Sequence, residues 1–257
     1  MKNQQNSILF NIKEWHPLTE IPKREEGNPS RTTDSVKDKK DIAASTTQNR
    51  NPLLSGVSPV LIKLMWDILC YPYSSVSVRI KRLGISARAF ENALLEGCQK
   101  GLIFRSSAGS TIYLIPNPIT FEAFDMPYPY KRDVSIEHSY YVNCGCFLLS
   151  KDPRNKSVQP EVKLGDSGST SDIVTVAHDG TKNAFEVTLN TTNVLANATK
   201  YYKTDYVSIT YLCRDYKLRE AVKACCREGG LNPDLLAKLE YMQFSTLLRR
   251  QRKLSLY

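Results

Sequence analysis

Hydrophobic positions recur at helical spacing in three consecutive stretches of the first half of the chain. Ser58 and Pro59 begin the first stretch, and this pair is typical of a helix start because serine caps free amide groups and proline fits the first turn. Glycines follow the second and third stretches, as expected where helices end. Alternating apolar residues at 104–115, on either side of a glycine, then predict a β-hairpin. The three helices are expected at 59–71, 76–83 and 86–101.

The second half of the chain alternates between helical and strand patterns. Apolar residues at helical spacing predict a helix at 134–149, which Pro153 ends. A strand at 158–164 precedes two further strands joined by Asp179 and Gly180, since an Asp-Gly pair accepts the positive φ of a short turn. The elements expected after this hairpin are a helix at 191–203, a buried strand at 206–213, a helix at 216–227 and a last helix from 232 past 242.

The predicted hairpin, residues 172–188, brings acidic residues on neighbouring strands together. Folding about its turn places Asp172 roughly opposite Val187, while Glu186 and Thr188 share one face of a strand. Two carboxylates in such positions can hold a hard cation such as Mg²⁺. The alternative is that both acids are solvated outer positions, as charged residues mostly are.

Composition changes along the chain and divides it into domains. The first 53 residues are polar and charged, so they cannot bury enough apolar surface to offset the entropy of ordering. An apolar cluster at 8–15 within them is either a partner-docking motif or a fraying helix. We therefore expect a disordered tail at 1–53, a helical domain at 54–117, a stiff proline-rich linker at 118–130, an α/β domain at 131–242 and a basic tail at 243–257.

Charge and cysteine usage narrow the possible functions. The 257-residue chain carries a formal charge of +9, which favours a polyanionic partner, and nucleic acid first. Seven cysteines without a CxxC pair, and only three histidines, argue against a zinc cluster and favour a reducing cytoplasm. The sequence shows no GxSxG motif of a serine hydrolase, no P-loop, and no apolar run typical of a transmembrane helix or signal peptide.

Three helices followed by a hairpin, over about residues 57–117, resemble the winged helix-turn-helix family. The sequence around the third helix matches the usual pattern of that family, with Leu83-Gly84-Ile85-Ser86 before the helix and Gly101-Leu102-Ile103 after it. The resemblance implies that the third helix enters the major groove and that the wing touches the DNA backbone. Winged helices also serve as protein–protein modules, which is the alternative. The candidate DNA-binding residues are Arg88, Asn92 and Lys100 on the third helix, Arg79 and Arg82 before it, and Arg105 on the wing.

The order helix, three strands, helix, strand over about residues 133–214 resembles the PD-(D/E)xK nuclease superfamily, which has the restriction-endonuclease-like fold. The resemblance implies a fold of the α/β (α+β) class with an α-β-β-β-α-β core. In that family one acid opens the second strand, and an acid-x-Lys motif closes the third. Asp172 and Glu186 match the two acids, and Thr188 stands where the family has its lysine.

The replacement of the family lysine by Thr188 matters because threonine cannot carry the positive charge that stabilises a reacting phosphate. Lys200 or Lys203, on the following helix, could supply that charge from another backbone position. Glu137, on the first helix of the core, could complete a shell for Mg²⁺ or Mn²⁺.

Together the two resemblances imply a DNA-binding protein with a metal-dependent nuclease-like domain, of the mobile-element or phage-defence type. The expected catalytic residues are Asp172, Glu186, Thr188 and Lys200, and the expected metal ligands are Asp172, Glu186 and Glu137. The alternative is a catalytically inactive DNA-binding adaptor or regulator that acts with a partner protein, such as a separate motor ATPase. A regulator with a ligand-sensing second domain is a third reading, and a dimer is compatible with all of them.

Overall fold

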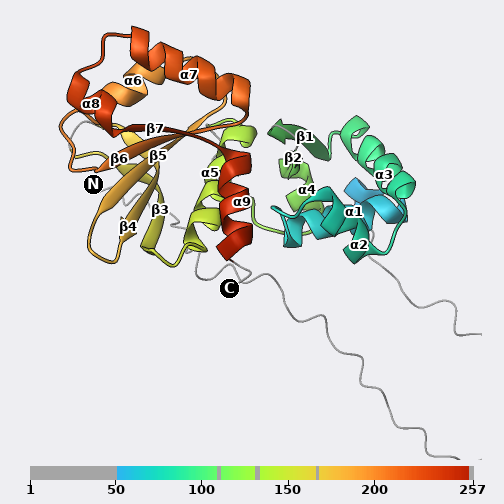
Figure 1. Ribbon diagram of the computed structural model, residues 1–257. Helices are drawn as coiled ribbons and strands as arrows, with labels where there is room; N and C mark the ends of the chain where they lie inside the picture. The colour runs from blue at the N-terminus through green and yellow to red at the C-terminus, as the bar shows by residue number, and fades with distance from the viewer. Residues whose placement is uncertain (1–50, 109–110, 131–133, 166–167, 255–257) are drawn as a thin grey trace, which may run out of the picture.

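The computed structural model describes residues 51–108, 111–130, 134–165 and 168–254. Its architecture is mixed α/β, with a helical N-terminal module followed by a module built on a five-stranded mixed sheet (Figure 1). The disorder expected for residues 1–50, and the apolar cluster at 8–15, lie outside the described residues.

The first module contains the three predicted helices and the predicted hairpin. Each helix begins at a serine whose hydroxyl accepts a backbone hydrogen bond, namely Ser58, Ser75 and Ser86. Gly84 ends the second helix with φ at 64°, a conformation that side chains disfavour. The elements are α1 (Pro59–Cys70), α2 (Val76–Leu83), α3 (Ala87–Gln99), and the antiparallel strands β1 (Ile103–Ala108) and β2 (Thr111–Pro116). A 3-10 helix, η1 (Pro52–Leu54), precedes them where the end of a disordered tail was expected.

The second module is a sheet of order β3-β4-β5-β6-β7 with helices on both faces. The first three strands are antiparallel, and β6 and β7 continue the sheet in parallel to β5. In chain order its elements are α5 (Ile136–Ser150), β3 (Asn155–Lys163), β4 (Thr170–Ala177), β5 (Lys182–Thr188), α6 (Val194–Thr199), β6 (Ser208–Cys213), α7 (Tyr216–Glu228), α8 (Pro233–Lys238), β7 (Leu239–Gln243) and α9 (Phe244–Leu254).

Each face of the sheet has its own core, because alternate strand residues point to opposite sides. Ile173 and Phe185 pack toward α5 and α9, whereas Val174, Ala184 and Tyr211 pack toward α6 and α7. Figure 1 shows α5 and α9 side by side against one face and α6 and α7 over the other. Within the described chain no helix is long and apolar enough to cross a membrane.

The C-terminal part of this module differs from the sequence prediction. The last predicted helix ends at Lys238, and the chain then forms the strand β7, in which Leu239 lies beside Ile209 of β6. The expected basic tail begins with helix α9, whose Phe244 is buried against Tyr141 of α5. Pairing with a distant strand decides the structure here, and no local hydrophobic period reveals such a partner.

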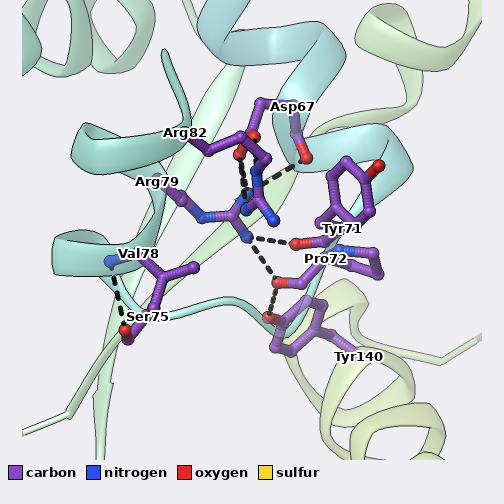
Figure 2. A network of polar contacts seen from close by, with 8 residues as sticks. All are labelled: Asp67, Tyr71, Pro72, Ser75, Val78, Arg79, Arg82 and Tyr140. Atoms are coloured by element: carbon purple, nitrogen blue, oxygen red, sulfur yellow. Dashed lines mark hydrogen bonds and ion pairs between the residues drawn. The ribbon is translucent and has the colours of Figure 1, made fainter. Parts of the chain in front are cut away.

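The expected linker contains a helix, α4 (Pro118–Ala123), and joins the two modules through a shared core. Phe121 and Tyr130 of this stretch are buried and touch edge to face, and both belong to the core cluster that contains Tyr140 and Tyr141 of α5. The turn after α1 is fastened to α5 as well, since the Tyr140 hydroxyl donates to the carbonyl of Pro72 at 2.8 Å (Figure 2). The modules therefore pack as neighbours with a continuous apolar interface.

Candidate functional site

The turn of the β4–β5 hairpin brings the two candidate acids side by side. Ile173 pairs with Phe185, and the same register extended by one residue places Asp172 level with Glu186. This is one residue from the expected position opposite Val187. The amide of Val187 nevertheless donates to the Asp172 Oδ2 atom at 2.8 Å, so the carboxylate of Asp172 is fixed against the neighbouring strand.

Glu186 is a buried carboxylate with two protein donors. It is 1% exposed. The Lys200 ammonium lies 2.8 Å from its Oε2 atom, and the Tyr201 hydroxyl donates to its Oε1 atom. Burial and then the charge of Asp172 raise the pKa of Glu186, Lys200 and Tyr201 counteract part of that rise, and the resulting pKa is about 7. Glu186 therefore changes charge near neutral pH.

His138 is the second partner of the acid pair. Ser135 caps α5 by accepting from the His138 amide, which places His138 in the first turn, next to the start of β4. Its Nε2 atom lies 3.3 Å from Oδ1 of Asp172. Burial lowers the pKa of His138, but the hydrogen bond and the negative charges of Asp172, Glu186 and Glu161 outweigh it, so the pKa is raised overall. The negative charges around the imidazole therefore favour its cationic form more than water does.

Of the other residues predicted for the site, Lys200 lies beside Glu186 and Glu137 does not. Lys200 reaches Glu186 as expected, and it also donates to the Thr170 carbonyl at 2.7 Å. Thr188 is buried and donates to the backbone carbonyl of Glu186. Glu137 faces elsewhere, because its carboxylate accepts from Ser106 of β1 at 2.5 Å and lies 3.7 Å from Arg214. His138, its neighbour on α5, contacts Asp172 in its place.

The donor set of this site does not fit a divalent cation. All four carboxylate oxygens of Asp172 and Glu186 already contact a protein donor, one of which is the ammonium of Lys200. Within the described residues no group of three or more His, Cys, Asp or Glu side chains is arranged to hold a metal ion. Mg²⁺ needs several free oxygen ligands, so binding would require these hydrogen bonds to break first. The arrangement instead forms a neutralised polar cluster of His138, Asp172, Glu186, Lys200 and Tyr201, here called the acid cluster.

The acid cluster predicts a loss of stability as pH rises. The folded-state pKa of Glu186 is about 7 against 4.5 for the free side chain, so the folded protein binds more protons between these values. The free energy of unfolding should therefore fall through this window, by about 3 kcal/mol from this group. The raised pKa of His138 adds a fall of the same sign at higher pH.

Urea unfolding of the wild type and of Glu186→Gln from pH 4.5 to 7.5 measures this effect. The Gln side chain does not titrate, so the slope of stability against pH should be smaller in the variant. Equal slopes in the two proteins would contradict the assignment to Glu186.

The candidate DNA-binding residues divide into buried and exposed groups. Arg79 is 0% exposed and forms an ion pair with Asp67 at 2.5 Å, so the expectation that it contacts DNA is corrected (Figure 2). Its guanidinium also donates to the carbonyls of Tyr71 and Pro72. Arg82 is partly exposed but is held by Asp67 at 2.5 Å and lies over the Tyr71 ring. Both arginines fasten α2 to the end of α1.

The other four candidates form the exposed basic face of the first module. Arg88 and Asn92 lie one turn apart on α3, Lys100 follows the end of that helix, and Arg105 lies on β1; all four are exposed. In the part of the chain that the structure describes, Arg88, Lys100 and Arg105 have no ion-pair partner within 4 Å. Their charges are therefore available to a polyanion. We call these four residues the reader face.

Sequence reasoning missed His138 and Tyr201 as members of the acid cluster. A histidine in the first turn of a helix, and a tyrosine directly after a candidate lysine, are weak signals when taken singly. A comparison of the chain with protein-family models and with curated proteins finds no match.

Proposed function

We propose that this chain is a DNA-binding adaptor that contacts DNA through the reader face and uses a nuclease-like second module as a scaffold. The observation that carries the proposal is the separation of free and neutralised charge. Cationic side chains on α3 and the wing are exposed and unpaired among the described residues, whereas the carboxylates of Asp172 and Glu186 are satisfied by protein donors. Phosphate neutralisation by Arg and Lys with release of counterions supplies the affinity.

The wing is held rigidly for such a role. Ser106 of β1 donates to Glu137 and lies 3.0 Å from the Tyr141 hydroxyl, so the inner side of the hairpin is tied to α5. Arg105, the residue before it, is exposed. Successive side chains of a strand point to opposite sides, so one side of the wing contacts the second module and the other side is exposed to solvent.

The triple variant Arg88→Ala, Lys100→Ala, Arg105→Ala should bind duplex DNA more weakly and with less dependence on salt. Each lost phosphate contact reduces the slope of log affinity against log salt by about 1, so the slope should fall by about 3. Fluorescence anisotropy with a labelled duplex between 50 and 200 mM salt, conditions in which the effect is large, measures both quantities.

The matched control removes three basic residues from the second module, Lys217, Lys223 and Arg227 of α7, also by substitution with Ala. It loses the same charge, so general electrostatic attraction changes equally in the two proteins. A control variant that loses as much of the slope as the reader-face variant would contradict the assignment of the reader face.

The second candidate function is a metal-dependent nuclease, and the position of Lys200 favours it. Its ammonium lies beside Glu186, where the resembled family carries a lysine two residues after the second acid. Calorimetric titration with Mn²⁺, together with plasmid cleavage by the wild type, Asp172→Asn and Glu186→Gln, separates the two functions. An adaptor should show no heat of Mn²⁺ binding and no plasmid cleavage. Cleavage by the wild type that is lost in both variants would establish the nuclease.

A further inference from the structure

A cavity of about 150 Å³ lies where the two modules meet. It is lined by residues of α1, the turn after it, the stretch that follows α4, and α5. Leu69 and Pro72 come from the first module, Tyr130 from the connecting stretch, and Asn143 and Phe147 from α5. Any molecule in this space would touch both modules at once.

The lining is apolar and aromatic, with no charged side chain among the residues that form it. Tyr73 and Phe147 lie with ring centroids 5.0 Å apart, and Phe121 meets Tyr130 edge to face at 5.9 Å. A flat aromatic ring is a favourable occupant of such walls, because offset and edge-on contacts add to the area it buries. A charged ligand would lose its hydration without gaining a counterion.

A few polar atoms interrupt the apolar wall. The Asn143 carboxamide nitrogen donates to the carbonyl of Ser139 at 2.9 Å, and no hydrogen bond from the described part of the chain reaches its oxygen, which is thus a free acceptor there. The hydroxyls of Tyr73 and Tyr130 have no hydrogen-bond partner among the described residues. Burial raises the pKa of both phenols, so they stay neutral and can donate or accept. An apolar cavity with a small number of polar groups is the usual form of a small-molecule site.

We infer that this cavity is a binding site for a small neutral aromatic ligand with one hydrogen-bond donor, of the size and type of indole or phenol. A cavity of this volume with apolar walls accommodates a benzene-sized molecule. The ligand's N–H or O–H group donates to the free oxygen of Asn143, and its ring contacts Tyr73, Phe121 and Phe147. None of the residues that line the cavity belongs to the acid cluster or to the reader face, so the inference does not depend on the proposed adaptor function.

The test uses indole and indene as probes with the full chain, in calorimetry and thermal unfolding. Wild type should bind indole about fivefold more tightly than indene, a hydrocarbon of the same ring size without the N–H group, which is the usual value of one added hydrogen bond. At ten times its dissociation constant, indole should raise Tm by about 4 °C. Wild type that binds neither probe overturns the inference.

Two substitutions of Asn143 locate the site. In Asn143→Phe the larger ring fills the cavity, so binding of both probes should be lost, while Asn197→Phe on α6 should bind as wild type does. In Asn143→Ala the acceptor is removed, so the fivefold preference for indole should disappear while indene still binds. Unchanged indole binding by a folded Asn143→Phe protein overturns the inference. If that variant does not fold, Asn143→Ala decides, since a retained preference for indole overturns the assignment and a lost preference supports it.

Discussion

Replacing Asp67 with alanine is expected to lower the free energy of unfolding by about 3–5 kcal/mol, because it leaves a buried charge without its partner. Arg79 has no exposed surface, and its ion pair with Asp67 is its only contact with an acid among the described residues. Burial already lowers the pKa of Arg79, which shows how costly its charge is in this position. Urea unfolding monitored by circular dichroism measures the loss.

The matched control is Glu91→Ala, which removes an exposed acid from α3 and should change stability by less than about 0.5 kcal/mol. The double variant Asp67→Leu, Arg79→Met replaces the pair with apolar side chains and should recover much of the loss. If the Asp67→Ala variant is as stable as wild type, Arg79 is free to reach solvent. The prediction that Arg79 contacts DNA would then stand again.

Replacing Lys200 with methionine is expected to destabilise the protein by about 3 kcal/mol at pH 8 and far less at pH 5. Lys200 is the cation that contacts the buried Glu186 carboxylate, and its loss raises the pKa of Glu186 further. At pH 5 Glu186 is protonated and needs no counterion. At pH 8 the folded variant must either keep Glu186 protonated or bury its charged carboxylate without a cation, and both lower its stability. Unfolding free energies at the two pH values give the difference directly.

Lys203→Met provides the control, since this lysine is exposed three residues further along the chain. Adding Glu186→Gln to Lys200→Met should remove most of the penalty at pH 8, because no charge is then left to bury. A penalty that is equal at pH 5 and pH 8 would mean that Lys200 acts through packing, and the electrostatic account of the acid cluster would be wrong.

The first module could be predicted from the sequence because its signals are local. Serine caps, the positive φ of Gly84 and a helical period of apolar residues each act within a few residues. The strand β7 could not be predicted, because Leu239 and Met242 fit a helical pattern as well and their partners on β6 are about 30 residues away in sequence. The longer the separation of partners, the less a local pattern determines the structure.

The candidate site shows the same limit. The hairpin turn correctly brought Asp172 close to Glu186, and the position of Lys200 was anticipated. The contact of His138 depends on how α5 lies on the sheet, which packing of two distant elements decides. The burial of Arg79 likewise depends on Asp67, twelve residues earlier on another helix, so a basic residue shortly before α3 looked free when it was not.

The most direct test of the adaptor proposal follows the anisotropy of an end-labelled duplex mixed with the protein in the presence of Mn²⁺. The proposal predicts that anisotropy rises on binding and then stays constant, because the reader face holds the DNA and the acid cluster leaves it intact. A rise followed by a decay that Glu186→Gln abolishes would show cleavage at this site and would contradict the proposal, as would the absence of any rise.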